Sequence, residues 1–206
     1  DSSYLFCGPR GSGKTTTARI MAKAVNCLGP QNGAPCNQCT ICKSVNDGRF
    51  MDIIELDAVS NRGSDEIREI RETVNFAPVQ GQGKVYIIDE AHMLTDQASN
   101  AFLKTLEEPP AHVMFILCTT EAQRILPTIV SRCQRLDFRR IPAGVIFQRL
   151  EEISRAEGAT VDSDALRLVS RFAEGSLRDA ANLLEQLVVA YSDGVGAVSY
   201  THLTLP

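Results

Sequence analysis

One loop constrains this chain more than any other part of its sequence. Residues 8–15 read GPRGSGKT, which matches the pattern G-x-x-x-x-G-K-[S/T]. The apolar run YLFC at 4–7 precedes this loop, and a helical pattern follows it. Such a loop wraps its backbone amides around an anion, and the N-terminus of the next helix adds positive potential. Since both flanks are those that phosphate binding requires, a chance glycine-rich turn is the weaker interpretation.

The motif assigns roles to its residues. We predict that the following residues bind the nucleotide: Gly8, Pro9, Arg10, Gly11, Ser12, Gly13, Lys14, Thr15 and Thr16. Lys14 is expected to reach the β- and γ-phosphates, while the hydroxyl group of Thr15 ligates Mg²⁺.

Two carboxylates follow the apolar run KVYIID at 84–89. Asp89 ends this run and Glu90 comes next. A phosphate loop needs a carboxylate for its metal, and we predict that Asp89 holds Mg²⁺ directly or through water. Glu90 is placed to polarise the attacking water as a general base. The alternative is an acidic pair that only caps a strand. The tetrad DEAH also occurs in one class of helicases, but no other helicase motif is visible.

Short apolar runs alternate with helical patterns through the first two thirds of the chain. Five runs predict buried strands: 4–7, 52–57, 84–89, 112–120 and 133–139. Three segments carry apolar residues at helical spacing: 15–26, 64–76 and 96–107. Strands that alternate with helices indicate a mainly parallel sheet covered on both faces. The predicted fold class is therefore α/β, a P-loop NTPase with a parallel five-stranded sheet.

The pattern changes after about residue 141. Three amphipathic segments follow, each ending in Gly: 143–158, 163–175 and 176–194. No strand pattern intervenes, so we predict a nucleotide-binding domain over 1–140 and a separate helical domain over 141–193. Residues 194–206 have no charge and no helical period, and we leave them unassigned as a frayed end or a junction.

Four cysteines lie close together, one helix after the phosphate loop. Cys27, Cys36, Cys39 and Cys42 have the spacing C-x8-C-x2-C-x2-C. Four thiolates suit tetrahedral Zn²⁺, and no ligand position is left for water, so we expect a structural ion. The module, about residues 27–50, is too short for a core of its own and would gain its fold from the ion. Redox-active or disulfide-bonded thiols are the alternative.

Composition and the first residues of the chain limit its possible partners and its cellular compartment. The chain has 206 residues, a net charge of −4 and a pI near 5.4, which argues against nucleic-acid binding through a basic surface alone. No apolar run reaches the roughly 20 residues of a membrane span. The opening DSSYLFCGPR has no basic region typical of a signal peptide, and its abrupt start before a strand suggests an N-terminal truncation. We therefore predict a cytoplasmic protein with no membrane partner, in which Cys7, Cys118 and Cys133 are inert, packed thiols.

Six segments together resemble one family. In chain order they are GPRGSGKTTTARIMAKAVNC, the four-cysteine module, VYIIDEAHML, AFLKTLEEPP, IVSRCQR and GSLRDA. This set, over about residues 4–193, is similar to that of the gamma/tau subunits of bacterial DNA polymerase III, the motor ATPases of the clamp loader. The resemblance implies an AAA+ fold with a three-helix lid and ATP as the nucleotide. It also implies an ATPase within the polymerase holoenzyme that loads the sliding clamp onto primed DNA during replication.

The resemblance also implies roles for residues to which sequence patterns alone assign none. Thr120, with Thr119 beside it, falls in the sensor-1 segment, and Arg178 in SLRDA matches the sensor-2 position that contacts the γ-phosphate. Arg132 in IVSRCQR matches the arginine finger, which acts on ATP held by the adjacent subunit. Without the family, Arg178 is a solvated residue on an amphipathic helix. The full catalytic set is then Lys14, Asp89, Glu90, Thr120, Arg132 and Arg178.

The family implies several partners. They are the delta and delta-prime subunits, further gamma/tau copies, the sliding clamp, and primed template DNA held by phosphate contacts. The segment SNRGSDE at 60–66 falls where the family lines the DNA chamber, so Arg62 and the amides near Ser64 are candidates. Gly63 stands where a further basic residue is expected, and a charged turn is the alternative.

Two other functions stay open. A non-hydrolysing structural subunit such as delta-prime is disfavoured by the intact residues Gly13, Lys14 and Thr15 and by the carboxylate pair. Another AAA+ motor, for example one that drives branch migration, is disfavoured by the cysteine module directly after the first helix and by the SRC and LEEPP elements.

Overall fold

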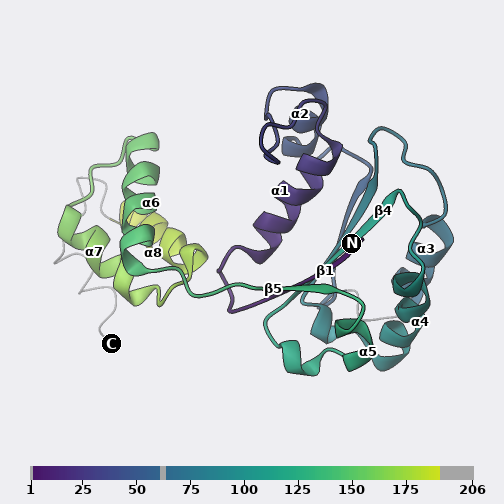
Figure 1. Ribbon diagram of the computed structural model, residues 1–206. Coiled ribbons are helices and arrows are strands. Elements are labelled where there is room, and N and C mark those ends of the chain that lie inside the picture. The colour runs from purple at the N-terminus through teal and green to yellow at the C-terminus, as the bar shows by residue number, and fades with distance from the viewer. Residues whose placement is uncertain (1, 61–63, 191–206) are drawn as a thin grey trace. The chain divides into compact units, whose positions relative to one another are not determined.

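Residues 2–60 and 64–190 are described by a computed structural model of the chain (Figure 1). The chain divides into two compact units, Asp1–Gly8 with Lys14–Asp137 and Pro9–Gly13 with Phe138–Pro206. Within the described residues, none of the helices combines the length and the apolar character that crossing a membrane requires.

The first unit is built on a sheet of five parallel strands. Its strands are β1 (Ser3–Cys7), β2 (Ile53–Asp57), β3 (Lys84–Asp89), β4 (Val113–Thr119) and β5 (Gln134–Asp137). Their order across the sheet is β2-β3-β4-β1-β5, and every neighbouring pair is parallel. The parallel five-stranded sheet predicted from the alternating pattern is confirmed.

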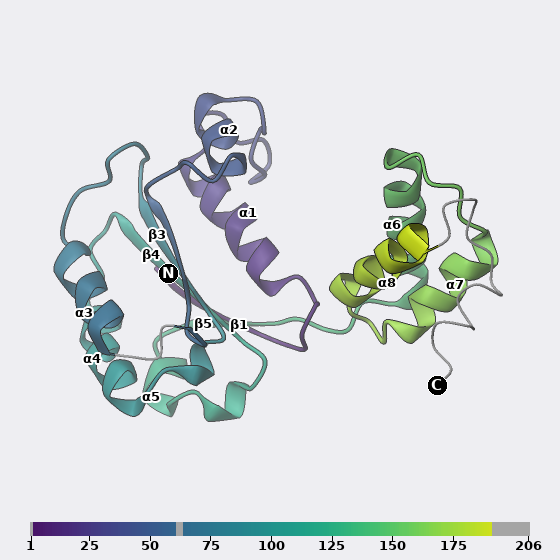
Figure 2. The same ribbon diagram turned by 180° about the vertical axis from the view of Figure 1, so that it is seen from behind.

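Helices cover both faces of this sheet (Figures 1 and 2). Helix α1 (Lys14–Asn26) lies on one face, with Ala18 and Ala22 buried. The other face carries α3 (Ser64–Thr73), α4 (Asp96–Glu107) and α5 (Pro127–Val130). The core on that side includes a cluster of rings: the centroids of Phe102 and Phe115 are 5.0 Å apart, and those of Tyr86 and Phe115 are 5.3 Å apart. Each of these side chains is at most 2% exposed, so burial of large apolar groups holds α4 on the sheet.

The strand order determines where a ligand can bind. The chain leaves β1 toward β2, which lies at the far edge, and later returns past β1 to β5. In parallel sheets, ligands bind at the carboxyl ends of the strands where the winding changes direction. Here that point lies beside β1 and β4, and the phosphate loop follows β1 directly.

Two buried polar side chains hold the segment before β3. Asp52, which is 0% exposed, accepts hydrogen bonds from the backbone N–H groups of Val79 (2.8 Å), Gln80 (2.6 Å) and Gly81 (2.7 Å). Asn26 at the end of α1 accepts from the next two N–H groups, at 2.9 and 3.0 Å. A buried carboxylate is tolerated only when it is hydrogen-bonded, and these amides satisfy it. The segment approaches so closely that a Cβ atom on Gly81 would lie 2.2 Å from Asn26 Oδ1.

The second unit contains three helices in the part that the structure describes. They are α6 (Ala143–Ala156), α7 (Ser163–Phe172) and α8 (Leu177–Ala190). Ile146, Leu150, Val169 and Leu184 belong to a buried cluster that joins all three. Asp162 caps α7, because its side chain accepts a hydrogen bond from the N–H of Asp164.

Several details differ from the sequence-based expectation. The strands predicted at 52–57 and 133–139 are not fully buried: β2 is only partly buried, and every residue of β5 is exposed. Both are edge strands, and an edge strand has a single neighbour, so the apolar runs predicted more burial than the structure has.

The helices also differ in extent from the prediction. The predicted helix 64–76 ends at Thr73. Short elements escaped the pattern because they span too few residues for a period: α2 (Thr40–Asn46), α5, and the 3₁₀ turns η1 (Ala91–Met93) and η2 (Ala122–Arg124).

Candidate functional site

The phosphate loop connects β1 to α1. Its first residue is attached to the sheet, because Gly8 N donates to Thr119 O at 3.1 Å. Gly11 and Gly13 have φ values of 71° and 93°, a left-handed region that glycine enters without strain. Ser12 Oγ donates to Pro9 O at 2.7 Å and closes the turn. In the second unit, to which Gly11 belongs, Leu177 N donates to Gly11 O at 3.2 Å.

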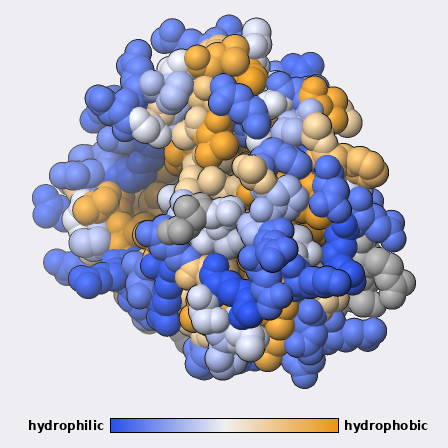
Figure 3. All heavy atoms as spheres, turned by 45° about the vertical axis from the view of Figure 1, so that its right-hand side comes forward, coloured by the Kyte–Doolittle hydropathy of each residue, from blue (hydrophilic) through white to orange (hydrophobic). Residues whose placement is uncertain are grey.

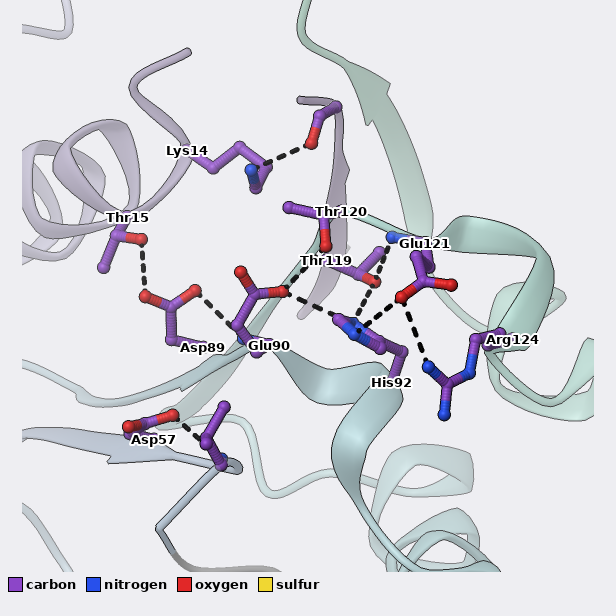
Figure 4. A network of polar contacts seen from close by, with 12 residues as sticks. Lys14, Thr15, Asp57, Asp89, Glu90, His92, Thr119, Thr120, Glu121 and Arg124 are labelled. Carbon is purple, nitrogen blue, oxygen red and sulfur yellow. Dashed lines mark hydrogen bonds and ion pairs between the residues drawn. The ribbon is translucent and has the colours of Figure 1, made fainter. Parts of the chain in front are cut away.

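Lys14 and Thr15 begin α1. Lys14 is 6% exposed, and its Nζ atom donates to Gly8 O at 2.9 Å. The ammonium group therefore turns back over the loop that precedes it (Figure 4). A buried cation at the start of α1 suits an anionic ligand, because the ammonium group and the N-terminus of the helix both offer positive potential.

The predicted magnesium ligands meet in space. Thr15 Oγ1 donates to Asp89 Oδ2 at 2.8 Å, although the two residues are 74 positions apart (Figure 4). The other oxygen of Asp89, Oδ1, accepts from Glu90 N at 2.9 Å. A hydroxyl and a carboxylate oxygen are the hard ligands that Mg²⁺ takes from protein, so this pair fits the ion. The contact arises because α1 and the carboxyl end of β3 both lie beside the loop.

Glu90 leaves the strand in an unusual backbone conformation. Its φ and ψ values are 47° and 46°, the left-handed region, which non-glycine residues seldom adopt. Its carboxylate accepts a hydrogen bond from Thr120 Oγ1 at 3.1 Å. The structure thus joins the predicted general base to the predicted sensor-1 residue at adjacent strand ends, β3 and β4 (Figure 4).

Sequence reasoning missed two residues beside Glu90. The Nδ1 atom of His92 lies 3.0 Å from Thr119 Oγ1 and 3.3 Å from Glu90 Oε2, and its Nε2 atom lies 3.3 Å from Glu121 Oε1. The signal was present in the sequence, since His92 completes the DEAH tetrad and Glu121 follows the Thr pair. Only the fold brings the two segments together.

The remaining predicted residues lie elsewhere. Arg132 precedes β5, and it donates to Glu107 Oε1 and to Thr128 O, both at 2.6 Å. Residues at the amino ends of β1 and β5 line the 410 Å³ pocket that contains Arg132, whereas the phosphate loop follows the carboxyl end of β1. The structure therefore does not bring Arg132 to the phosphate loop of its own chain.

Other candidates are exposed or outside the described residues. Arg178 is exposed on α8, and Arg10 is exposed in the loop. Thr16 is also exposed and lines a 520 Å³ groove with Arg19 and Lys23 of α1. The DNA candidates Arg62 and Gly63, and the tail 194–206, lie outside the described residues. Ser64 is the first residue of α3, so its amide lies at a helix start, as the sequence predicts.

The cysteine module brings its four sulfur atoms together. The Sγ atoms of Cys27, Cys36, Cys39 and Cys42 all lie within 4.8 Å of one another, and those of Cys36 and Cys42 are 4.0 Å apart. Zn–S bonds of about 2.3 Å imply tetrahedral edges of about 3.8 Å, which this arrangement approaches. All seven cysteines are free, so no disulfide competes for these thiols. The donor set therefore fits a four-sulfur metal site.

Backbone amides prepare two of these thiols to become thiolates. A hydrogen bond from Cys36 N to the sulfur of Cys27, at 3.3 Å, lowers the pKa of Cys27. A bond from Cys42 N at 3.4 Å lowers the pKa of Cys39 to about 6. Burial instead raises the pKa of Cys42, so a bound cation would have to stabilise that thiolate. The three cysteines outside the module differ: burial raises the pKa of Cys7, of Cys133 to about 11, and of Cys118 to about 12.

Comparison with known proteins adds family information to this geometry. Residues 1–142 match the family model described as DNA polymerase III, delta subunit, and residues 145–194 match the model described as DNA polymerase III clamp loader subunit, ATPase lid domain. The first match alone leaves the non-hydrolysing rival open. A tau subunit of DNA polymerase III from Bacillus subtilis is 53% identical over 90% of this chain. The chain belongs to the gamma/tau family of DNA polymerase III subunits.

Other gamma/tau relatives agree. The tau subunit of Escherichia coli is 45% identical over 96% of the chain, and the gamma/tau subunit of Mycoplasma genitalium is 47% identical over 90%. The chain spans about a third of the length of these relatives, 33% of the Bacillus subtilis protein and 30% of the Escherichia coli protein.

Solved structures place the chain in a wider fold group. The Thermotoga maritima RuvB branch migration motor matches with a TM-score of 0.69 at 15% identity, covering 98% of this chain and 60% of that one. A sequence identity this low supports a shared fold and no shared function. The chain therefore has the AAA+ fold predicted for it.

Proposed function

We propose that this chain is the ATP-driven motor part of a DNA polymerase III clamp loader, which hydrolyses ATP to load the sliding clamp onto primed DNA during replication. The observation that carries this proposal is the contact between Thr15 and Asp89, at 2.8 Å, beside Lys14. A hydroxyl group and a carboxylate brought together at the start of α1 are the ligands that a magnesium-dependent nucleotide hydrolase needs. The gamma/tau relatives support the same conclusion.

In the proposed ATP site, different residues bind the phosphates, hold the metal and activate water. The loop residues Gly8 to Thr16 surround the phosphates, and Lys14 neutralises charge on the β- and γ-phosphates. Thr15 and Asp89 would hold Mg²⁺, which supplies charge neutralisation for phosphoryl transfer. Glu90 accepts the proton of the attacking water, and Thr120 orients Glu90 through their hydrogen bond at 3.1 Å.

Two arginines would complete the site when subunits assemble. We assign Arg132 to an ATP site on the adjacent subunit, because its own phosphate loop lies at the opposite end of the strands. In the single chain, Glu107 neutralises Arg132. Arg178 is assigned to the lid, where it would contact the γ-phosphate. These roles divide the chain into a nucleotide domain at 1–140 and a lid at 141–193.

The cysteine module, residues 27–50, would hold structural Zn²⁺. The four sulfur atoms fill a tetrahedral shell, so no position is left for water and the ion takes no part in hydrolysis.

The proposed partners are delta, delta-prime, further gamma/tau copies, the sliding clamp and primed DNA, in the cytoplasm. Apolar side chains gather in several patches among hydrophilic residues on the face drawn in Figure 3. The segment between α3 and β3 exposes Phe76 (65%) and Val79 (70%) while Asp52 holds its backbone. Exposed apolar groups on a fixed backbone suit a protein partner.

The test uses a loader reconstituted from full-length subunits. ATP turnover is measured with the clamp alone, with primed DNA alone, and with both together. A motor that couples hydrolysis to loading turns over fastest with both partners present. Equal rates in all conditions would refute the loading function, and absence of magnesium-dependent nucleotide binding would refute the motor itself. A branch-migration motor would instead respond to four-way junctions.

A mixed assembly tests Arg132. When Arg132→Ala replaces one copy, we expect hydrolysis at the neighbouring site to fall by about 10³-fold, since an arginine finger contributes about 10³–10⁵ in rate. Nucleotide binding by the variant copy itself should persist. Turnover equal to wild type in the fully substituted assembly would contradict the assignment.

A further inference from the structure

The imidazole of His92 lies between two carboxylates. Its side chain is only 6% exposed. Its Nδ1 atom faces Thr119 Oγ1 at 3.0 Å and Glu90 Oε2 at 3.3 Å, and Nε2 faces Glu121 Oε1 at 3.3 Å (Figure 4). The dashed contacts of the ring in Figure 4 go to Thr119, Glu90 and Glu121, so any effect of His92 on ATP hydrolysis would pass through Glu90.

The donors around the ring explain how it can hold Glu90. A neutral imidazole has one N–H donor and one acceptor nitrogen. Thr119 Oγ1 already accepts from Glu121 N at 3.0 Å, so its own hydrogen is available to the ring. With the proton on Nδ1, the N–H group faces Thr119 Oγ1 at 3.0 Å and Glu90 Oε2 at 3.3 Å and can be shared between them. With the proton on Nε2, the N–H group faces Glu121 instead, and Nδ1 accepts from Thr119.

The position of Glu90 makes this contact consequential. Glu90 follows the last residue of β3 and has left-handed backbone angles, so strand pairing does not extend to it. Two groups from separate elements meet at Oε2: Thr120 Oγ1 donates to it at 3.1 Å, and His92 Nδ1 lies 3.3 Å from it. A second contact from a different direction limits the rotation that a single hydrogen bond leaves to the carboxylate. A general base must be aimed at the water that it activates, and misplacement costs rate.

We infer that His92 is a positioning residue for hydrolysis: its Nδ1–H group, shared with Thr119 Oγ1, holds the carboxylate of Glu90. The inference rests on the proposed ATPase function and adds to it a residue that no motif assigned. It follows the general arrangement in which a base is itself oriented by a third group. His92 does not touch the nucleotide and is not a catalytic residue.

Three substitutions separate the two sides of the ring. In His92→Asn, the side-chain amide can occupy the place of Nδ1. In His92→Gln, the amide reaches the place of Nε2, and His92→Ala removes both. We expect kcat of the reconstituted full-length loader to fall about 10-fold or more in the Ala and Gln variants, because aligned general bases contribute about 10²–10⁴. His92→Asn should stay within about 3-fold of wild type, and the Kd for magnesium-ATP should not change.

A second background tests whether the effect passes through Glu90. In a Glu90→Gln loader, His92→Ala should cause no further loss, because the group that it positions is already gone. Arg124→Gln is the matched control: it removes the other ion pair of Glu121, an exposed contact at 3.2 Å, and should leave kcat near wild type. Thermal unfolding of each variant separates loss of fold from loss of rate.

The outcomes are distinct. Undiminished or increased kcat in His92→Ala, an equal loss in both backgrounds, or a Kd that weakens in parallel would each overturn the inference and leave the proposed function standing. A wild-type loader with no ATP turnover would overturn the proposed function, and this inference with it.

Discussion

The cysteine module and the phosphate site lie at opposite ends of α1, and they are assembled in different ways. All four sulfur ligands come from a single stretch, residues 27–42. The phosphate site instead collects Thr15, Asp89, Glu90 and Thr120 from three separate parts of the chain. We propose that the first site depends on an ion to stay together, whereas the second is held by a packed sheet. Two sites that are neighbours along the sequence should therefore fail independently.

Removal of the metal gives the largest effect and the strongest test of this comparison. Structural Zn²⁺ contributes about 10–16 kcal/mol of apparent binding free energy in small peptides, so a strong chelator should disorder residues 27–50. The sheet should remain folded, since Phe102, Phe115 and the rest of its core are elsewhere. Amide hydrogen exchange resolves the two regions.

Cys42→Ser should reproduce the effect of the chelator. Cys133→Ser is the control, because it removes a thiol outside the module and should leave one zinc per chain. A module that keeps its exchange protection in a zinc-free sample, or a sheet that unfolds together with it, would break the comparison.

Asp89→Asn probes the opposite case. The change weakens the magnesium site while it leaves the sheet and the cysteines in place, so we expect ATP turnover of the assembled loader to fall about 10²-fold or more. Zinc content and exchange protection in 27–50 should not change. Asp96→Asn, an exposed carboxylate in the first turn of α4, is the control and should keep near wild-type turnover. Loss of zinc in the Asp89 variant would show that the two sites are coupled.

Asp52→Asn sharpens the comparison at a smaller scale, within the sheet domain. The amide keeps one acceptor oxygen but turns an NH₂ group toward backbone donors, so we expect a loss of about 2–3 kcal/mol in the free energy of unfolding. Denaturant titration measures it. Asp162→Asn is the control, since Asn caps a helix about as well as Asp.

The same carboxylate predicts a pH dependence. Burial would raise the pKa of Asp52, but the three backbone donors prevail and lower it below its ordinary value. Its stabilisation is therefore fully present above the unfolded pKa of about 3.9 and is lost as the pH falls through the lower folded value. The wild type should lose this part of its stability in acid and the Asn variant should not. Parallel acid profiles for the two proteins would contradict this account.

The sequence by itself determined the groups that carry local chemistry. Glycines and one lysine at fixed spacing define the phosphate loop, and two x2 spacings define the cysteine cluster, because each feature works over a few neighbouring residues. The alternating pattern was also sufficient for the parallel sheet, since strand burial and helix periodicity are local signals. The strand ends then indicated where Asp89 and Glu90 would lie.

Tertiary structure decided which distant groups meet. No spacing rule connects His92 to Glu121, or Asp52 to the amides of Val79 and Gln80, because these contacts depend on the order of strands in the sheet. Edge position, which left β5 exposed, depends on the same order. Hydrogen bonds and burial are properties of three-dimensional neighbours, so the sequence could supply the reactive groups but not the partners that orient them.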